Sequence, residues 1–219
     1  MSRVLVIGDT HCPAMHPRYL RFLNKIRDKW KTTRVVHIGD VVDFHCISFH
    51  EKHPDNPGAL AEHKLACKQI KKLHEEFAGA EVCIGNHDRR PMRINSRQGV
   101  PGLYLKQFND LYGTDTWKWV DSTTIDGVHY YHGEGSGGAC PAMLAAKHRL
   151  CPVVLGHFHS ACGVWYQVGP TAKIWGMSVG CGVDRDHWSM QYGAAFLRKP
   201  VVGCGVVIDG EPYVETMNL

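Results

Sequence analysis

The 219-residue chain lacks long hydrophobic runs. Its longest apolar stretches have four or five residues, far short of the roughly 20 that a membrane-spanning helix needs. It also lacks a charged-then-apolar leader, since Met1-Ser2-Arg3 passes directly into a strand-like run. Linkers, low-complexity tracts and tandem repeats are absent as well. These absences predict a cytoplasmic protein with no membrane partner.

Cysteine pairing motifs are also missing. The nine cysteines are an odd number and none forms a Cys-x-x-Cys motif, which favours reduced thiols over a disulfide framework. With 44% hydrophobic and 21% charged residues, the composition is typical of a globular protein. The net charge of +4 permits an anionic substrate but does not by itself indicate nucleic acid. We expect a single domain over residues 1–219.

Histidine, by contrast, is abundant. The 15 histidines are spread from His11 to His187, so they are neither a tag nor a low-complexity tract. Because histidine is the commonest metal ligand, a metal site is the first hypothesis to examine.

A short phrase recurs along the chain: an apolar run, a glycine, and then a residue that can bind metal. It occurs at Val4–Asp9, Val35–Asp40, Val82–Asn86 and Val153–His157, with a variant that ends in His132-Gly133. Short β-branched runs bounded by glycine predict buried strands.

Amphipathic stretches separate these strands. Residues 17–31 carry Tyr19, Leu23, Ile26 and Trp30 on one stripe, which predicts a helix. Residues 58–77 show a similar stripe of Leu65, Cys67, Ile70, Leu73 and Phe77, and residues 102–112 and 139–150 also resemble helices. Alternating strands and helices predict an α/β fold.

The last third of the chain, residues 164–219, has a different pattern. Its short strands at 165–168, 173–179 and 201–208 are joined by glycine-rich turns, and Asp209-Gly210 is typical of a hairpin turn. We therefore expect a β-rich C-terminal half and two sheets that pack together.

The polar residue ends the strand in each copy of the phrase. If the strands share a sheet, their carboxyl ends meet at one edge, where ligands of α/β proteins bind. Seven oxygen and nitrogen donors without a thiolate suit divalent ions of the Mn, Fe, Co, Ni and Zn group. They suffice for two ions roughly 3.5–4 Å apart that share a bridging carboxylate. The seven are Asp9, His11, Asp40, Asn86, His132, His157 and His159.

Five motifs occur in order over residues 8–159: Asp9-Thr10-His11, Gly39-Asp40-Val41-Val42-Asp43, Gly85-Asn86-His87-Asp88, His132-Gly133 and Gly156-His157-Phe158-His159. With this set the sequence resembles the calcineurin-like metallophosphoesterase superfamily, in particular the small phosphoesterases of bacteria and their phages. The resemblance implies a four-layer α/β/β/α sandwich of two mixed sheets flanked by helices.

The resemblance also implies a role for each motif residue. One metal ion falls to Asp9, His11, Asp40 and His159, and the second to Asp40, Asn86, His132 and His157, so that Asp40 is the bridge. Mn²⁺ is the expected metal, with Fe, Zn, Ni, Co and Mg as alternatives. His87 is implied to face the substrate, where it donates a proton to the leaving oxygen or stabilises the phosphoryl charge. Asp43 is implied to orient His87 and favour its protonated form.

The implied reaction is hydrolysis of a phosphate ester by in-line attack of metal-bound hydroxide. Ser/Thr protein phosphatases carry an Arg-Gly pair after the second aspartate, whereas this chain has Phe44-His45. Without that arginine to clamp a dianionic monoester, a phosphodiester in DNA, RNA or a nucleotide is favoured as substrate. A phosphomonoesterase on small molecules or protein phosphate is the first alternative. A non-catalytic scaffold, like the retromer subunit of the superfamily, is the second, although every ligand position is filled here.

Four arginines follow His87 closely. We expect Arg89 and Arg90 to contact substrate, while Arg93 and Arg97 extend the basic run. With Trp165, Trp175 and Trp188 they suggest a nucleic-acid groove. The alternative is a solvated basic loop and core aromatics.

Several segments around the motifs have open roles. His45, His50, His53 and His63 form a lid over the site or are ordinary loop histidines, and residues 184–188 shape substrate choice or an oligomer contact. The stretches 44–85 and 89–131 are expected to build the walls that face the substrate.

Overall fold

In the computed structural model, which describes residues 2–49 and 51–218, strand β1 (Arg3–Ile7) is buried on both faces. Leu5 and Ile7 pack into one apolar layer, and Val4 and Val6 pack into another. This alternation follows from the period of two of a strand. Strand β1 therefore lies in the middle of the molecule, between two layers of core.

Strand β1 belongs to a six-stranded sheet with the order β11-β10-β1-β2-β3-β4. The pairs β1–β2, β2–β3 and β3–β4 are parallel, whereas β1–β10 and β10–β11 are antiparallel. The Asp209-Gly210 hairpin turn is confirmed, since both residues have positive φ between β10 and β11. The other strands are β2 (Arg34–His37), β3 (Glu81–Cys83), β4 (Lys118–Val120), β10 (Gly203–Ile208) and β11 (Glu211–Thr216).

The second sheet has five strands in the order β5-β6-β7-β9-β8. Its central pairs β6–β7 and β7–β9 are parallel, and its outer pairs are antiparallel. Val154 of β7 packs into the layer between the sheets, while its neighbours Val153 and Leu155 face the opposite layer. The strands are β5 (Ser122–Ile125), β6 (Val128–Tyr131), β7 (Val153–Leu155), β8 (Cys162–Val168) and β9 (Lys173–Val179).

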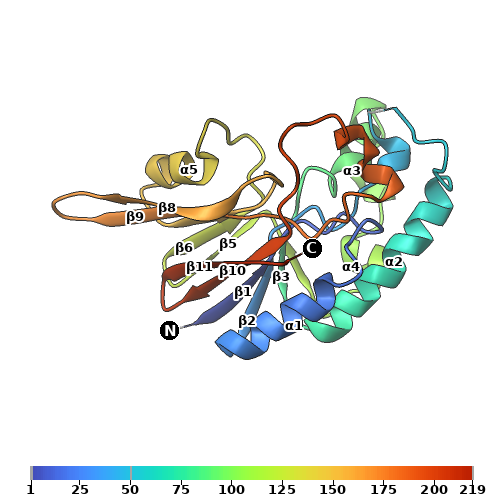
Figure 1. Cartoon of the computed structure of the whole chain (residues 1–219). Helices are drawn as coiled ribbons and strands as arrows, with labels where there is room; N and C mark the ends of the chain where they lie inside the picture. The colour runs from blue at the N-terminus through green and yellow to red at the C-terminus, as the bar shows by residue number, and fades with distance from the viewer. Residues whose placement is uncertain (1, 50, 219) are drawn as a thin grey trace.

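Helices cover the outer face of each sheet (Figure 1). Helices α1 (Tyr19–Trp30) and α2 (Ala59–Glu76) pack on the first sheet, and α5 (Pro141–Arg149) packs on the second. The remaining helical segments are α3 (Arg90–Arg97), α4 (Phe108–Tyr112) and the short 3-10 turns His45–Ile47, Gly102–Tyr104 and Trp188–Gly193. No helix in the described part of the chain is long and apolar enough to cross a membrane.

The order helix, sheet, sheet, helix confirms the predicted four-layer α/β/β/α sandwich of two mixed sheets. The β-rich C-terminal half contributes to both sheets, since β8 and β9 belong to the second and β10 and β11 join β1 in the first. Two local expectations need correction. Residues 90–97 form a helix rather than a loop, and Leu65 is 39% exposed because the buried stripe of α2 runs through Ala66 instead.

The nine cysteines are all free thiols. Cys83 and Cys204 are buried among core residues, whereas Cys67 and Cys151 are only half-buried. The structure thus agrees with reduced cysteines and shows no disulfide among them.

His37, at the end of β2, is fully buried in a chain of hydrogen bonds. The backbone N–H of Gly39 donates to its Nδ1 at 3.2 Å, so Nε2–H donates to Thr10 Oγ1 at 3.1 Å. The Thr10 hydroxyl in turn donates to the carbonyl of Val41 at 3.1 Å. A second proton, on Nδ1, would point at the N–H of Gly39, which leaves the ring no acceptor for it. Burial also disfavours the charged ring and lowers the pKa of His37 from 6.5 to about 4.

This buried neutral histidine predicts a loss of stability in acid. Because the folded pKa lies below the unfolded one, the unfolded chain binds the proton first as pH falls below 6.5. Between pH 7 and pH 5 this linkage costs about 2 kcal/mol. Urea unfolding at the two pH values measures this effect. Between pH 7 and pH 5 the free energy of unfolding should fall by about 2 kcal/mol more in the native protein than in His37→Gln. Equal losses in the two proteins would contradict the assignment.

Candidate metal centre

The loops that follow five strands meet at one edge of the sandwich. Asp9, Asp40 and Asn86 follow the parallel strands β1, β2 and β3 of the first sheet. His132 and His157 follow β6 and β7, which are parallel strands of the second sheet. The predicted ligands therefore converge, but the strands that carry them do not share one sheet.

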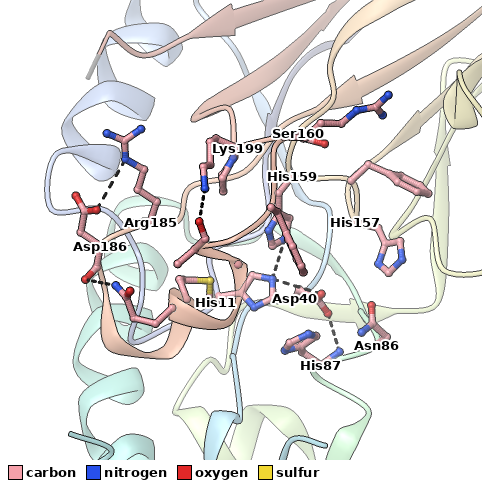
Figure 2. A pocket seen from close by; sticks show the side chains of 18 residues that line it. His11, Asp40, Asn86, His87, His157, His159, Ser160, Arg185, Asp186 and Lys199 are labelled. Atoms are coloured by element: carbon pink, nitrogen blue, oxygen red, sulfur yellow. Dashed lines mark hydrogen bonds and ion pairs between the residues drawn. The ribbon is translucent and has the colours of Figure 1, made fainter. Parts of the chain in front are cut away.

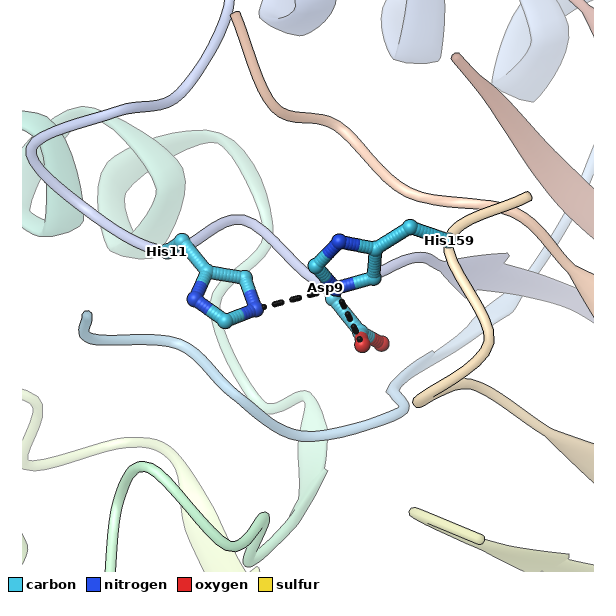
Figure 3. Close-up of side chains that lie close together, drawn as sticks. All are labelled: Asp9, His11 and His159. Atoms are coloured by element: carbon cyan, nitrogen blue, oxygen red, sulfur yellow. Dashed lines mark hydrogen bonds and ion pairs between the residues drawn. The ribbon is translucent and has the colours of Figure 1, made fainter. Parts of the chain in front are cut away.

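Asp9, His11 and His159 form the first group of side chains (Figure 3). The Nε2 atom of His159 lies 3.2 Å from Asp9 Oδ2 and 3.0 Å from His11 Nε2. Asp9 and His11 are buried, whereas His159 is partly exposed. The group is thus open to solvent from the His159 side.

Asn86, His132 and His157 surround a second position. His132 Nε2 lies 2.9 Å from Asn86 Oδ1 and 3.1 Å from His157 Nδ1. The backbone N–H of His157 also donates to Asp9 Oδ2 at 2.9 Å, which ties the second sheet to the loop after β1.

Asp40 lies between the two groups. Its Oδ2 is 3.5 Å from His11 Nε2 and 3.2 Å from His132 Nε2, and its Oδ1 accepts the backbone N–H of His87 at 2.8 Å. Three sets of possible ligands each have donor atoms within 4.8 Å of one another: Asp9, His11 and His159; His11, Asp40 and His87; Asp40, His132 and His157. All seven predicted ligands are therefore brought together, with Asp40 in the middle.

Three of these residues have a left-handed backbone. His11, Asp40 and His157 have φ values of 44°, 48° and 65°, a conformation that non-glycine residues adopt rarely. Such strain persists only where the surrounding structure holds it, and it concentrates at functional sites. Here it turns each loop sharply, so that the side chain points back over the end of its strand.

Two close glycines make room for the carboxylates. A Cβ added to Gly85 would lie 2.1 Å from Asp40 Oδ1, and one added to Gly156 would lie 2.2 Å from Asp9 Oδ1. No real Cβ approaches this closely, so only glycine fits beside either carboxylate.

The protonation pattern fits metal binding. His11 Nδ1 lies 2.9 Å from Asp43 Oδ1, and His132 Nδ1 lies 3.2 Å from the Ile38 carbonyl. When each Nδ1–H donates to its acceptor, each Nε2 presents a lone pair to the centre, which is the usual arrangement of a ligating histidine. Asp9 Oδ1 is buried and accepts no hydrogen bond from the described residues. These residues could hold divalent metal ions.

Electrostatics balance the buried carboxylate. Burial by itself raises the pKa of Asp40, but the charges of His132 and His87 outweigh this effect and hold it well below its usual value. Burial lowers the pKa of His132, and the neighbouring Asp40 raises it to about 10. In the protein without metal, the histidines thus supply the positive charge that a cation would otherwise bring.

His87 lies beside the centre and is held by Asp43. Its Nδ1 is 2.7 Å from the Asp43 carbonyl oxygen and 3.2 Å from Asp43 Oδ1. Because Asp43 Oδ1 also contacts His11, this one carboxylate orients a predicted ligand and the predicted proton donor together. Arg90 donates to the carbonyl oxygens of Asp43 and Phe44 and lies 3.1 Å from His87 Nε2.

Arg89 and Arg93 are engaged by other protein groups. Arg89 donates to the Ile84 carbonyl and to Asp121, and Arg93 donates to Glu134 and to the backbone carbonyl of Asn86. Among the three tryptophans, Trp175 is buried in the core, Trp165 packs on the layer beneath α5, and Trp188 contacts His45. The predicted groove of arginines and tryptophans is therefore not formed.

A cavity of about 600 Å³ opens over the centre (Figure 2). Besides the site residues, the segment 185–200 lines it, and neither 44–85 nor 89–131 builds its wall. His45, His53 and His63 do not line it either, so the predicted histidine lid is wrong for these three, and His50 lies outside the described residues. Arg185 and Asp186 of the 184–188 loop do face the cavity, which supports a role for this loop at the site.

Asp88 is a supporting residue that the motif contained but the sequence did not explain. Its carboxylate accepts the backbone N–H of Gly85 at 2.9 Å and of Val42 at 3.2 Å, joining the loops that carry Asn86 and Asp40. Burial, together with the charge of Asp40, raises its pKa to about 7. Its position in Gly-Asn-His-Asp was the only sequence signal for this role.

The fold and the convergence of these motifs agree with the comparison with protein families. Residues 2–169 match the model of the calcineurin-like phosphoesterases, and the chain belongs to this family. No curated protein matches the sequence.

Solved structures that resemble the chain have varied descriptions. Vps29 from Chaetomium thermophilum is 13% identical, with a TM-score of 0.48, covering 99% of this chain and 97% of its own. The E. coli phosphoesterase YfcE is 13% identical, with a TM-score of 0.45, and the match covers 99% of this chain and 100% of YfcE. The nuclease MPE from Pseudomonas putida is 13% identical, with a TM-score of 0.39, and the match covers 97% of this chain and 86% of the nuclease.

The close approach of Gly85 to Asp40 predicts that a single methyl group disturbs the centre. In Gly85→Ala the new Cβ must displace the Asp40 carboxylate, so affinity for Mn²⁺ should fall about 10- to 100-fold, as when a ligand loses the group that orients it. Gly137→Ala is the matched control, since nothing lies within 4 Å of its added Cβ. Calorimetric titration of both folded variants with Mn²⁺ checks this. Native affinity in Gly85→Ala would contradict it.

Proposed function

We propose that the protein is a phosphodiesterase that hydrolyses nucleic acid or nucleotide substrates with two divalent metal ions, Mn²⁺ being the expected metal. One observation carries the proposal: the buried Asp40 carboxylate lies between two sets of nitrogen and oxygen donors. We assign one ion to Asp9, His11, Asp40 and His159, and the other to Asp40, Asn86, His132 and His157.

Two bound divalent ions would neutralise charge on the phosphoryl oxygens and lower the pKa of a water molecule. The chain supplies the remaining chemistry. Asp43 holds His87 through Nδ1, and Arg90 Nη2 lies 3.1 Å from Nε2 on the opposite edge of this ring, which lines the cavity. Burial lowers the pKa of His87, but Asp40 and Asp43 outweigh burial, and the pKa is raised. For His87 to carry a proton at Nε2 and give it to the departing oxygen, the Arg90 guanidinium that lies 3.1 Å from Nε2 must first move, and we assign this movement to substrate binding.

The engaged arginines support a diester over a monoester. An arginine clamp on its terminal oxygens would favour a dianionic phosphomonoester, and the arginines that directly follow His87 do not supply one. Arg89 is engaged by Asp121 and the Ile84 carbonyl, and Arg90 by two carbonyl oxygens. Arg90 is the one of this pair near His87, and we assign it a contact with the single charge of a diester.

The division of roles between ligands and proton donor predicts different losses in two variants. Asp40→Ala should lose both metal and turnover, because the carboxylate contacts both groups of ligands. His87→Ala should keep its metal while turnover falls about 10²- to 10⁴-fold. Mass spectrometry of bound metal and hydrolysis of bis-p-nitrophenyl phosphate measure the two effects. His148→Ala, an exposed histidine on α5, is the control. Equal metal loss in both variants would contradict the assignment.

Substrate preference and metal dependence are tested together. The protein should cleave bis-p-nitrophenyl phosphate faster than p-nitrophenyl phosphate when Mn²⁺ is present. Chelation with EDTA should abolish both activities and added Mn²⁺ should restore them, because the donors bind metal reversibly. A preference for the monoester would favour the phosphatase alternative. No turnover in metal-loaded protein would favour a scaffold.

A further inference from the structure

One wall of the cavity carries three cationic side chains. Arg185, Arg198 and Lys199 line it, all from the segment that joins β9 to β10. Figure 2 shows Arg185 and Lys199 on one side of the cavity and His87 and Asn86 on the other. Asp186 is the one acidic side chain on this wall; it is 85% exposed, and its Oδ1 lies 3.9 Å from Arg185 Nε, so it offsets the charge of Arg185 in part. The wall therefore has a net positive charge.

Both ends of this segment are tied to the metal-ligand loops. The backbone N–H of Gly182 donates to the Asp9 carbonyl at 2.7 Å, and that of Val201 donates to the His159 carbonyl at 2.8 Å. Within the segment, Lys199 Nζ donates to the Ala194 carbonyl at 2.8 Å. The backbone of the segment is thus held at a set position relative to Asp9 and His159, the predicted ligands of the first ion.

Aromatic rings accompany the cations. Phe196 lines the same wall and is 57% exposed, and Phe158 stands next to His157 with ring centroids 5.0 Å apart. Proteins that bind single-stranded nucleic acid combine a cationic surface that follows the phosphates with aromatic rings on which bases stack. An exposed phenylalanine adds nothing to the binding of an inorganic phosphate chain, so this pairing favours a nucleic acid.

We propose that residues 185–200 bind a single-stranded nucleic acid beside the phosphodiester that is cleaved. Arg198 and Lys199 contact phosphates next to the scissile one, Arg185 extends this charged surface, and a base stacks on Phe196. The inference rests on the proposed phosphodiesterase function and names the substrate class of that site.

The charge part of the proposal is tested with two substrates. Bis-p-nitrophenyl phosphate has one phosphate and no strand, whereas an oligothymidylate has a phosphate at each link. The double variant Arg198→Gln with Lys199→Gln should lower kcat/KM for the oligonucleotide about tenfold more than for the small diester. The slope of log kcat/KM against log salt should also decrease by about 0.7 for each phosphate that the variant no longer neutralises. The control is Lys25→Gln with Lys68→Gln, two lysines on α1 and α2 that lie outside the cavity. This variant should change neither the ratio of kcat/KM for the two substrates nor the slope against salt.

The stacking part is tested with Phe196→Ala. This variant should cleave an oligothymidylate about tenfold more slowly than the native protein. An abasic oligonucleotide of the same length should show no such difference between the two proteins. Circular dichroism verifies that each variant is folded before its kinetics are compared.

The outcomes separate this inference from the proposed function. Suppose that the native protein cleaves the small diester and that the double variant loses the same factor in kcat/KM on both substrates. The proposal that residues 185–200 bind a nucleic acid is then wrong, and the proposed phosphodiesterase function stands. Faster cleavage of duplex than of single-stranded DNA by the native protein would also overturn the proposal for residues 185–200. If metal-loaded native protein cleaves no diester at all, the proposed function itself fails.

Discussion

The buried carboxylate of Asp40 is the group around which the rest of the site is built. A charge away from water is costly unless other groups pair with it. Asp40 meets this requirement with His11 on one side, His132 on the other and the backbone N–H of His87. Because these partners come from both sheets, the sheets must pack with their carboxyl ends at a common edge. The architecture of the sandwich and the charge balance of the centre are thus linked.

This requirement also accounts for the strained and crowded backbone around the centre. Asp40 has a φ of 48°, and its carboxylate and N–H fill the space that a Cβ of Gly85 would need. Asp88 accepts N–H groups from two of the loops and so holds them against each other. Asp43 contacts both His11 and His87. A few buried carboxylates therefore organise the loops, and the bulk hydrophobic core lies behind them.

The cavity above the centre has walls of two different origins. Its metal-side wall is made of motif residues, whereas the opposite wall comes from 185–200, a segment without any motif. Backbone hydrogen bonds to Asp9 and His159 join the two walls. Variation in that segment could therefore change which substrate is bound without disturbing the ligands. In the proposed assignment, the chemistry and the selection of substrate belong to separate parts of the chain.

The strands and the convergence of the seven donors could be predicted from sequence, because buried strands show as β-branched runs and glycine marks where each one ends. The four-layer sandwich was implied by the resemblance to a known family. Leu65 was misread because its neighbour Ala66 occupies the buried stripe of the helix. Residues 90–97 were read as a basic run, although they form a helix. The folded structure was needed to show that Arg89 faces Asp121 and that Arg198 and Lys199 face the cavity. The direction of a long charged side chain depends on partners that are distant in sequence. Local pattern therefore cannot reveal it.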